Sequence, residues 1–353
     1  IYTSGTTGKP KGVAMGDVPQ TQEWAEYRQS VREADPQQAG ARSLLALPMH
    51  HGAGPSVCTA ALTAGNTVVL MRRFSPEAAL ALIESQRINH WVTVPTMLNR
   101  IAALPKEVLD RYDVSSLRSL RTGAAPVPDS LKDWVRSYFG EVLHEAYGAT
   151  EVGMIAHLSP QDMRRKPGSS GKPYRHVRIR IKDEAGKVMP VGEAGAIWVK
   201  SPTVIQRYLN APLLGRDTID EDGYFQVGDV GRLDADGYVY LTDRIKDMII
   251  SGGVNIYPAE IEAALIRHPA VLDVAVIGVP DAEFGEAVKA FVELKSGDTL
   301  TSDALLAFVE PLLASYKRPR SVEFVSELPR NTMGKVLKRE LRNPYWKNQE
   351  RNV

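Results

Sequence analysis

Cysteine is almost absent from this sequence. The single thiol, Cys58, rules out an internal disulfide, and without a Cys-x-x-Cys pair no structural zinc site is expected. Such a chain suits a reducing compartment, so we expect it in the cytoplasm. Long hydrophobic runs are missing too: none approaches the roughly 18 residues of a spanning helix. We therefore expect no integral membrane segment.

An excess of charge of one sign is also lacking. The 43 lysines and arginines nearly balance the 42 aspartates and glutamates, which leaves a formal net charge of +1. The chain as a whole creates no strong field toward polyanions, so no nucleic-acid partner is expected. The sequence is silent on the oligomeric state and leaves a homodimer open.

The composition that remains is that of an ordinary globular protein. Hydrophobic residues make up 43% and charged residues 24% of 353 residues. This length exceeds the usual size of one domain, and two or more packed units are expected.

The first part of the chain alternates two kinds of pattern. Residues 67–71 and 91–94 are typical of buried strands, whereas residues 24–31 and 75–85 carry helical spacing, the latter opened by Ser75 as N-cap. Strands that alternate with helices predict parallel β/α layers.

After about residue 170 the pattern changes to short strands separated by tight turns. In residues 177–182 apolar side chains alternate with Arg178, Arg180 and Lys182, which predicts a strand of an antiparallel sheet. The three basic side chains offer a site for ligand phosphates, but a solvated strand face is the interpretation we favour.

The last hundred residues form a further pattern. Helices are predicted at 258–267 and 303–313, and strands at 271–279, 287–294 and 321–325. The predicted class is α/β: a large-domain portion with mixed parallel βα layers and a small antiparallel β subdomain, followed by a small α+β C-terminal domain.

A glycine-rich segment opens the chain. It combines three glycines, four Ser or Thr hydroxyls and two lysines: Tyr2-Thr3-Ser4-Gly5-Thr6-Thr7-Gly8-Lys9-Pro10-Lys11-Gly12. Glycines let backbone N–H groups approach an anion, while hydroxyls and ammonium groups add donors and charge, so phosphate is the fitting ligand. The Walker spacing is absent, and a surface linker is the alternative.

This segment resembles the signature of the adenylate-forming superfamily, which includes acyl-CoA synthetases, peptide-synthetase adenylation domains and firefly-type luciferases. Further segments resemble the superfamily's other motifs in the same order, over nearly the whole chain. They are Pro48-Met49-His50-His51-Gly52, Gly123-Ala124-Ala125-Pro126, Tyr147-Gly148-Ala149-Thr150-Glu151, Gly223-Tyr224-Phe225-Gln226-Val227-Gly228-Asp229, Asp243-Arg244-Ile245-Lys246-Asp247, Ser251-Gly252-Gly253 and Asn331-Thr332-Met333-Gly334-Lys335.

The resemblance implies a nucleotide site. Its expected ATP and AMP contacts are Thr3, Ser4, Gly5, Thr6, Thr7, Gly8, Lys9, Gly123, Ala124, Ala125, Tyr147, Gly148, Thr150, Asp229 and Arg244. By the same resemblance Tyr147 stacks on adenine, Asp229 binds the ribose hydroxyls and Thr150 bonds the α-phosphate. A plain turn at residues 123–126 and a helix start at residues 147–151 are the alternatives.

The catalytic assignments implied by the resemblance are Lys335, Glu151 and Thr150. An ammonium between the attacking carboxylate and the α-phosphate would orient both anions and stabilise the transition state. The carboxylate of Glu151 is a hard oxygen ligand and the expected holder of Mg²⁺.

The remaining motifs imply the acyl pocket, the hinge and the thiol tunnel. His50 and His51 would line the acyl pocket, with a packed histidine as the alternative, and their adjacency argues against a shared metal ion. Lys246 would be the hinge residue. Gly252 and Gly253 would let a pantetheine arm pass, although an ordinary hairpin turn would also use them.

The function implied is that of an acyl-CoA synthetase, with ATP, Mg²⁺ and coenzyme A. The expected domains are residues 1–243, a hinge at 244–248 and a mobile lid at 249–353. Amino-acid-activating members of the superfamily usually place an acidic residue near these histidines to meet the α-ammonium group, and Gly52-Ala53-Gly54-Pro55-Ser56 offers none. The resemblance therefore implies a fatty or aryl acid. The alternatives are a domain that loads a carrier protein, a luciferase-like oxygenase, or an inactive fragment, since Ile1-Tyr2 reads as the end of a strand within a domain.

Overall fold

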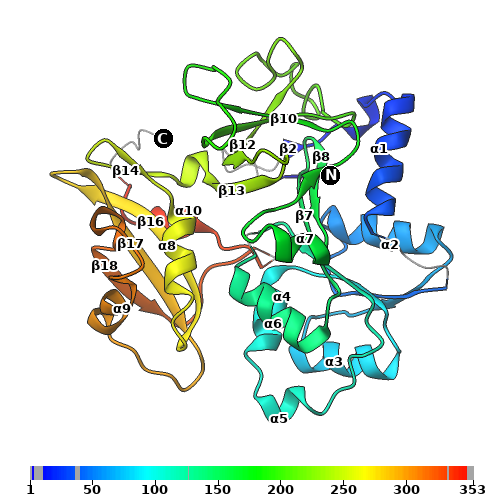
Figure 1. The fold of residues 1–353 in the computed structure, drawn as a ribbon, viewed down its shortest axis with the longest axis horizontal. Coiled ribbons are helices and arrows are strands. Elements are labelled where there is room, and N and C mark those ends of the chain that lie inside the picture. Colours follow the sequence, from blue (N-terminus) through cyan, green and yellow to red (C-terminus); the bar gives the residue numbers. More distant parts are fainter. Residues whose placement is uncertain (1, 4–10, 36–39, 126, 332–333, 348–353) are drawn as a thin grey trace. The chain divides into compact units, whose positions relative to one another are not determined.

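The computed structural model describes residues 2–3, 11–35, 40–125, 127–331 and 334–347. The chain forms two compact units, one of residues 1–227 with 231–241 and the other of residues 228–230 with 242–353. Figure 1 shows their helices and strands. Within the described ranges no helix has the length and apolarity needed to cross a bilayer.

A seven-stranded sheet forms the centre of the first unit, in the order β4-β3-β5-β6-β7-β8-β9. Its strands are β3 (Arg42–Leu45), β4 (Thr67–Leu70), β5 (His90–Val92), β6 (Ser119–Gly123), β7 (Leu143–Ala149), β8 (Gly153–Leu158) and β9 (Lys172–Pro173). The strands from β3 to β7 run parallel, whereas β8 and β9 are antiparallel to their neighbours. The parallel layers and the change to antiparallel pairing confirm the predicted class.

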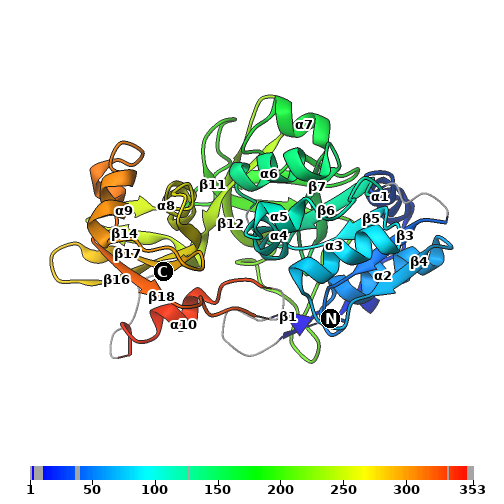
Figure 2. The same cartoon turned by 90° about the horizontal axis from the view of Figure 1, so that it is seen from below.

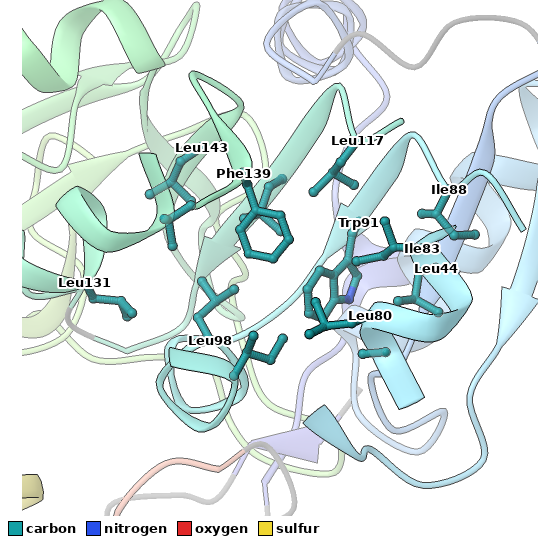
Figure 3. Close-up of a cluster of buried hydrophobic side chains, with 14 of the residues drawn as sticks. Leu44, Leu80, Ile83, Ile88, Trp91, Leu98, Leu117, Leu131, Phe139 and Leu143 are labelled. Atoms are coloured by element: carbon teal, nitrogen blue, oxygen red, sulfur yellow. The ribbon is translucent and has the colours of Figure 1, made fainter. Parts of the chain in front are cut away.

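Helices cover this sheet because their apolar residues recur on one side. The helices of this part are α2 (Ala53–Thr63), α3 (Pro76–Ser85), α4 (Pro95–Ala102), α5 (Lys106–Leu109), α6 (Asp129–Phe139) and α7 (Pro160–Arg165). Figure 2 shows α3, α4 and α6 side by side. In Figure 3, Trp91 of β5 lies among Leu80 of α3 and Leu98 of α4, all fully buried. Ser75 precedes α3 as predicted, but its hydroxyl makes no capping hydrogen bond.

Helix α1 (Gln22–Glu33) is tied to the sheet at two places. The hydroxyl of Tyr27 accepts a hydrogen bond from Met154 N on β8 at 2.7 Å. Just beyond the helix, the carboxylate of Asp35 pairs with His90 Nε2 at 3.0 Å and with Arg121 at 3.3 Å. Although burial opposes it, these two partners hold the pKa of Asp35 well below its usual range.

A second sheet has the order β10-β11-β12-β13, with β10 (Arg178–Lys182), β11 (Gly195–Lys200), β12 (Phe225–Leu233) and β13 (Val239–Arg244). The prediction of a solvated basic face on β10 is wrong for one of its three residues, Lys182, whereas Arg178 is exposed and Arg180 is partly exposed. Lys182 is buried and pairs with Asp220 at 2.7 Å, and Arg180 pairs with Asp222 and lies over the ring of Tyr224. Arg180 and Lys182 therefore have acidic partners from the loop before β12.

The second unit is a small α+β structure built on a five-stranded sheet of order β15-β14-β17-β16, with β18 beside β17. Its elements are β14 (Ile249–Ser251), β15 (Val254–Ile256), α8 (Pro258–Leu265), β16 (Val271–Asp281), β17 (Gly285–Leu294), α9 (Ser302–Val309), β18 (Ser321–Val325) and α10 (Lys338–Arg342).

Alternation along β16 gives this sheet two apolar faces. Val274 and Val276 pack with residues of α8 and α9, whereas Ala275 and Ile277 pack with Leu328 and the segment leading into α10. The sheet is therefore covered on both sides, and the second face carries the chain that follows β18.

We expect Leu98→Ala to lower the free energy of unfolding by about 2–5 kcal/mol, because it leaves a cavity in the core beneath the parallel strands. Leu62→Ala is the matched control, since Leu62 is a helical leucine with 60% of its surface exposed. Urea unfolding of both variants measures the difference. Equal effects would contradict this description of the core.

Candidate functional site

The predicted site residues of the first unit lie at one edge of the seven-stranded sheet. His50 and His51 follow β3, Gly123 ends β6, and Thr150 and Glu151 follow β7. Because β3, β6 and β7 run parallel, all of these residues lie beyond the carboxyl ends of the strands. In open α/β sheets this is the edge at which ligands bind.

At the end of β6 the backbone lies unusually close to its neighbour. A Cβ atom built on Gly123 would lie 2.2 Å from the carbonyl oxygen of Ala146 on β7, so only glycine fits. The next residue, Ala124, has a φ of 65°, a left-handed conformation that is uncommon outside glycine. Ala124 is exposed. The strand end therefore presents bare, strained backbone to a ligand.

The turn between β7 and β8 carries Thr150 and Glu151. The residues before it continue β7 as a strand, so the alternative of a helix start is wrong. Tyr147 is buried, while Gly148 is exposed and has no room for a side chain, because Gly153 O would lie 2.7 Å from its Cβ. Thr150 and Glu151 are half-buried at the tip.

Two short paired strands lie at the two ends of the glycine-rich segment. β1 (Tyr2–Thr3) pairs with β2 (Lys11–Gly12), with Thr3 opposite Lys11. The predicted phosphate ligands Ser4, Gly5, Thr6, Thr7, Gly8 and Lys9 lie outside the described residues. Beyond the loop, Gly12 O accepts a hydrogen bond from Leu209 N at 2.7 Å, which fixes its exit beside residues 208–209.

Glu151 fits the role of a magnesium ligand. Its Oε1 accepts a hydrogen bond from the hydroxyl of Tyr208 at 3.1 Å, and within the part of the chain that the structure describes no group pairs with Oε2. Mg²⁺ binds proteins through one or two carboxylates and keeps water and phosphate as its other ligands. Across the described ranges no cluster of three or more acidic, His or Cys side chains that could hold a metal ion occurs.

The two histidines after β3 differ in environment. His50 is exposed, whereas His51 is half-buried and its Nδ1 has no hydrogen-bond partner among the described residues. Burial and the neighbouring His50 lower the pKa of His51, so its ring is neutral at pH 7. Three residues after His51, position 54 has room only for glycine, because a Cβ atom built there would lie 2.3 Å from Pro48 O. A neutral imidazole suits an uncharged acyl group.

In the second unit, Asp229 and Arg244 are neighbours. Arg244 Nε lies 3.4 Å from Asp229 Oδ1, and the side chain of Asp229 is 14% exposed. The structure thus brings together the residue assigned to the ribose hydroxyls and the basic residue that begins the expected hinge.

Lys335 lies in a tight hairpin. Asn331 Oδ1 accepts a hydrogen bond from Lys335 N at 3.0 Å, Asn331 N donates to Lys335 O at 2.9 Å, and Gly334 has a φ of 75°. Among the described residues the ammonium of Lys335 has no ion-pair partner. Burial and the nearby guanidinium of Arg244 lower the pKa of Lys335 to about 8. The site thus holds a half-buried lysine whose ammonium is partly desolvated.

A cluster of ion pairs fixes α10, the helix that follows Lys335. Lys338 Nζ on α10 lies 2.7 Å from Glu262 Oε1 on α8, and Arg342 pairs with Asp247 at 2.9 Å. Asp243 accepts a hydrogen bond from Ala259 N at 2.8 Å, at the beginning of α8. Although burial opposes it, these carboxylates hold the pKa of Lys338 above its ordinary value.

The hinge and tunnel candidates lie in the same unit. Lys246 is exposed by its surface area, and partial desolvation together with Arg244 lowers its pKa. Gly252 and Gly253, with φ values of 58° and 78°, form the two-residue turn between β14 and β15. The hairpin alone accounts for both glycines, and their role in a tunnel stays a prediction.

Some residues of the site escaped prediction. Tyr208 was not singled out, and its sequence offers no signal beyond an aromatic beside basic Arg207. Lys338 and Glu262 also escaped, because their pairing joins segments far apart in the chain.

The fold and these side chains define an adenylate-forming enzyme. The chain belongs to the AMP-binding enzyme family: the family's sequence profile matches residues 1–209, and that of the AMP-binding enzyme C-terminal domain matches residues 260–335.

Three known proteins illustrate the similarity. Feruloyl-CoA synthase from Amycolatopsis sp is 40% identical over 347 residues, covering 98% of this chain and 69% of the relative. Indoleacetate–CoA ligase from Aromatoleum aromaticum is 40% identical over 345 residues, covering 97% and 66%. The structure of o-succinylbenzoate CoA synthetase from Bacillus subtilis, in complex with its acyl-adenylate intermediate OSB-AMP, matches with a TM-score of 0.80 and 35% identity, covering 97% and 69%.

These findings confirm the predicted superfamily and activity. The protein is an acyl-CoA synthetase of the AMP-forming acid–thiol ligase class, with ATP and coenzyme A as substrates. The chain spans about two thirds of the length of these relatives.

We expect Lys338→Met to destabilise the second unit by about 3–5 kcal/mol, because it leaves the buried carboxylate of Glu262 without its partner. The control is Lys317→Met, which breaks a more exposed pair with Glu260 on the same helix and should cost at most about 1 kcal/mol. Urea unfolding, monitored by amide hydrogen exchange of the second unit, measures the loss of stability in both variants. A loss no greater than the control's would show that the cluster is unimportant.

Proposed function

We propose that this acyl-CoA synthetase uses the ammonium of Lys335 for adenylation only. In the first half-reaction a carboxylate oxygen attacks the α-phosphorus of ATP and pyrophosphate leaves. In the second the sulfur of coenzyme A attacks the acyl carbon, AMP leaves, and the thiol proton passes to solvent. The observation that carries this proposal is the place of Lys335: its side chain is half-buried near Arg244, and its ammonium has no ion-pair partner among the described residues.

Negative charge collects at the α-phosphate during adenylation. Two anions must approach each other in the first half-reaction, and a cation between them stabilises the transition state more than the ground state. Desolvation strengthens such an interaction, and hydrogen bonds with Asn331 fix the backbone from which the side chain of Lys335 extends. The second half-reaction brings in a thiol and has no need of this cation.

The proposed nucleotide contacts follow the sequence assignments. The phosphates would bind the loop Thr3–Lys9 and Thr150, adenine would lie against Gly123, Ala124, Ala125, Tyr147 and Gly148, and the ribose would meet Asp229 and Arg244. Glu151 would hold Mg²⁺, which neutralises phosphate charge when bound. Lys246 would be the hinge between the half-reactions, and Gly252 and Gly253 would face the pantetheine arm.

We further propose that the acid carries an aromatic ring and no α-amino group. Two relatives at 40% identity, feruloyl-CoA synthase and indoleacetate–CoA ligase, are named after acids that carry an aromatic ring. Residues 52–56, which follow the neutral ring of His51, include no acidic side chain to meet an α-ammonium group.

A panel of acids with free coenzyme A tests the proposed function. We expect hydroxycinnamates or arylacetates to give kcat/KM values at least about tenfold above those of octanoate and palmitate, and phenylalanine to be inactive. Pyrophosphate release and thioester formation are measured together. A fatty acid as the best substrate would overturn the acid class, and adenylation without transfer to free coenzyme A would favour a carrier-protein acceptor.

We expect Lys335→Ala to lower adenylate formation by about 100- to 1000-fold and to leave thioester formation from supplied acyl-adenylate within about threefold of the wild type. Isotope exchange between pyrophosphate and ATP measures the first step. Lys295→Ala, at an exposed lysine of the same unit, is the control. Exchange that survives in Lys335→Ala would refute the assignment.

A further inference from the structure

Tyr208 contacts two segments that the proposed function assigns to different parts of the nucleotide site. Its hydroxyl donates a hydrogen bond to Oε1 of Glu151, which lies in the turn that follows β7, at 3.1 Å. Its ring lies 4.9 Å from the ammonium of Lys11, at the exit of the glycine-rich loop. One half-buried side chain thus contacts both the candidate magnesium ligand and the end of the phosphate loop.

Backbone hydrogen bonds hold this tyrosine in place. Ile205 N donates to Glu151 O at 3.0 Å on one side, and Leu209 N donates to Gly12 O at 2.7 Å on the other. Tyr208 itself forms an antiparallel bridge with Val13. Because residues 205–209 are fixed to both segments, the phenol ring enters its contacts from an ordered backbone.

The contact with Glu151 has a defined direction. A phenol has an ordinary pKa of about 10, so the hydroxyl of Tyr208 is protonated at neutral pH. A protonated phenol donates to the carboxylate, and this bond uses Oε1. The other oxygen, Oε2, keeps its lone pairs for a cation.

We propose that Tyr208 is a positioning residue that orients Glu151 toward Mg²⁺·ATP and holds the exit of the phosphate loop beside it. This inference rests on the proposed function, which assigns Glu151 to the metal and the loop to phosphate. Groups that orient a metal-binding side chain through a hydrogen bond raise the affinity of the site for the metal. Without the phenol, the carboxylate of Glu151 can turn away from the metal.

The chain contains a matched tyrosine–glutamate pair away from this edge of the sheet. The hydroxyl of Tyr112 donates to Glu77 Oε1 at 2.9 Å, at the beginning of α3. Tyr112→Phe removes the same atom from the same kind of bond in the same unit. It therefore controls for the general loss of one tyrosine–carboxylate hydrogen bond.

Calorimetric titration of ATP at a series of Mg²⁺ concentrations tests the proposal by binding, independently of turnover. We expect Tyr208→Phe to raise the half-saturating Mg²⁺ concentration about tenfold and Tyr112→Phe to leave it unchanged. In pyrophosphate exchange, saturating Mg²⁺ should restore kcat of Tyr208→Phe, because the reacting groups are intact.

A double-mutant cycle identifies the residue through which Tyr208 acts. In a Glu151→Gln background, Tyr208→Phe should change the Mg²⁺ requirement by less than about twofold, because the orienting bond no longer serves a metal ligand. An unchanged Mg²⁺ requirement in Tyr208→Phe, or the same shift with and without Glu151, would overturn the proposal. Failure of the wild type to bind Mg²⁺·ATP would instead contradict the proposed function.

Discussion

The second unit depends on the ion pair between the buried ammonium of Lys338 and the carboxylate of Glu262. The ammonium compensates Glu262 and lies near Asp243 and Asp247, carboxylates that would otherwise be buried without full neutralisation. Together with Arg342 it occupies the acidic groups around α10. The ammonium of Lys335, three residues before Lys338, is left without an ion-pair partner among the described residues and is available to substrate anions.

In the first unit, the sheet edge at the carboxyl ends of the parallel strands is shaped by backbone segments that lie very close together, rather than by charged side chains. Gly123 and Gly148 have no space for a Cβ, and Ala124 takes a strained left-handed conformation. These features leave bare backbone where a flat ring can lie. A charged side chain at this edge is Glu151, in the turn after β7, and the hydrogen bond from Tyr208 orients its carboxylate. The two units thus contribute different chemistry to the proposed reaction.

Much of this could be predicted from the sequence, because periodicity and turn residues are local. The parallel layers, the antiparallel sheet and the α+β unit follow from such patterns, as do Gly123 and Lys335 from the resemblance of their motifs. Partners distant in sequence could not be predicted. Lys182 looked solvated because Asp220 lies 38 positions away, and Tyr208 showed no signal because Glu151 lies 57 positions away. Gly252 and Gly253 fitted two roles, and local geometry supports the turn.

The ionisation of Lys335 tests the account most directly. Methyl-labelled lysines followed by NMR across pH 6–12 would report it, with the resonance assigned by its loss in Lys335→Arg. The account predicts a midpoint of about 8, since burial and Arg244 disfavour the charged form. A midpoint at the ordinary value of 10.5 would show a solvated surface lysine and contradict the claim that a desolvated cation drives adenylation.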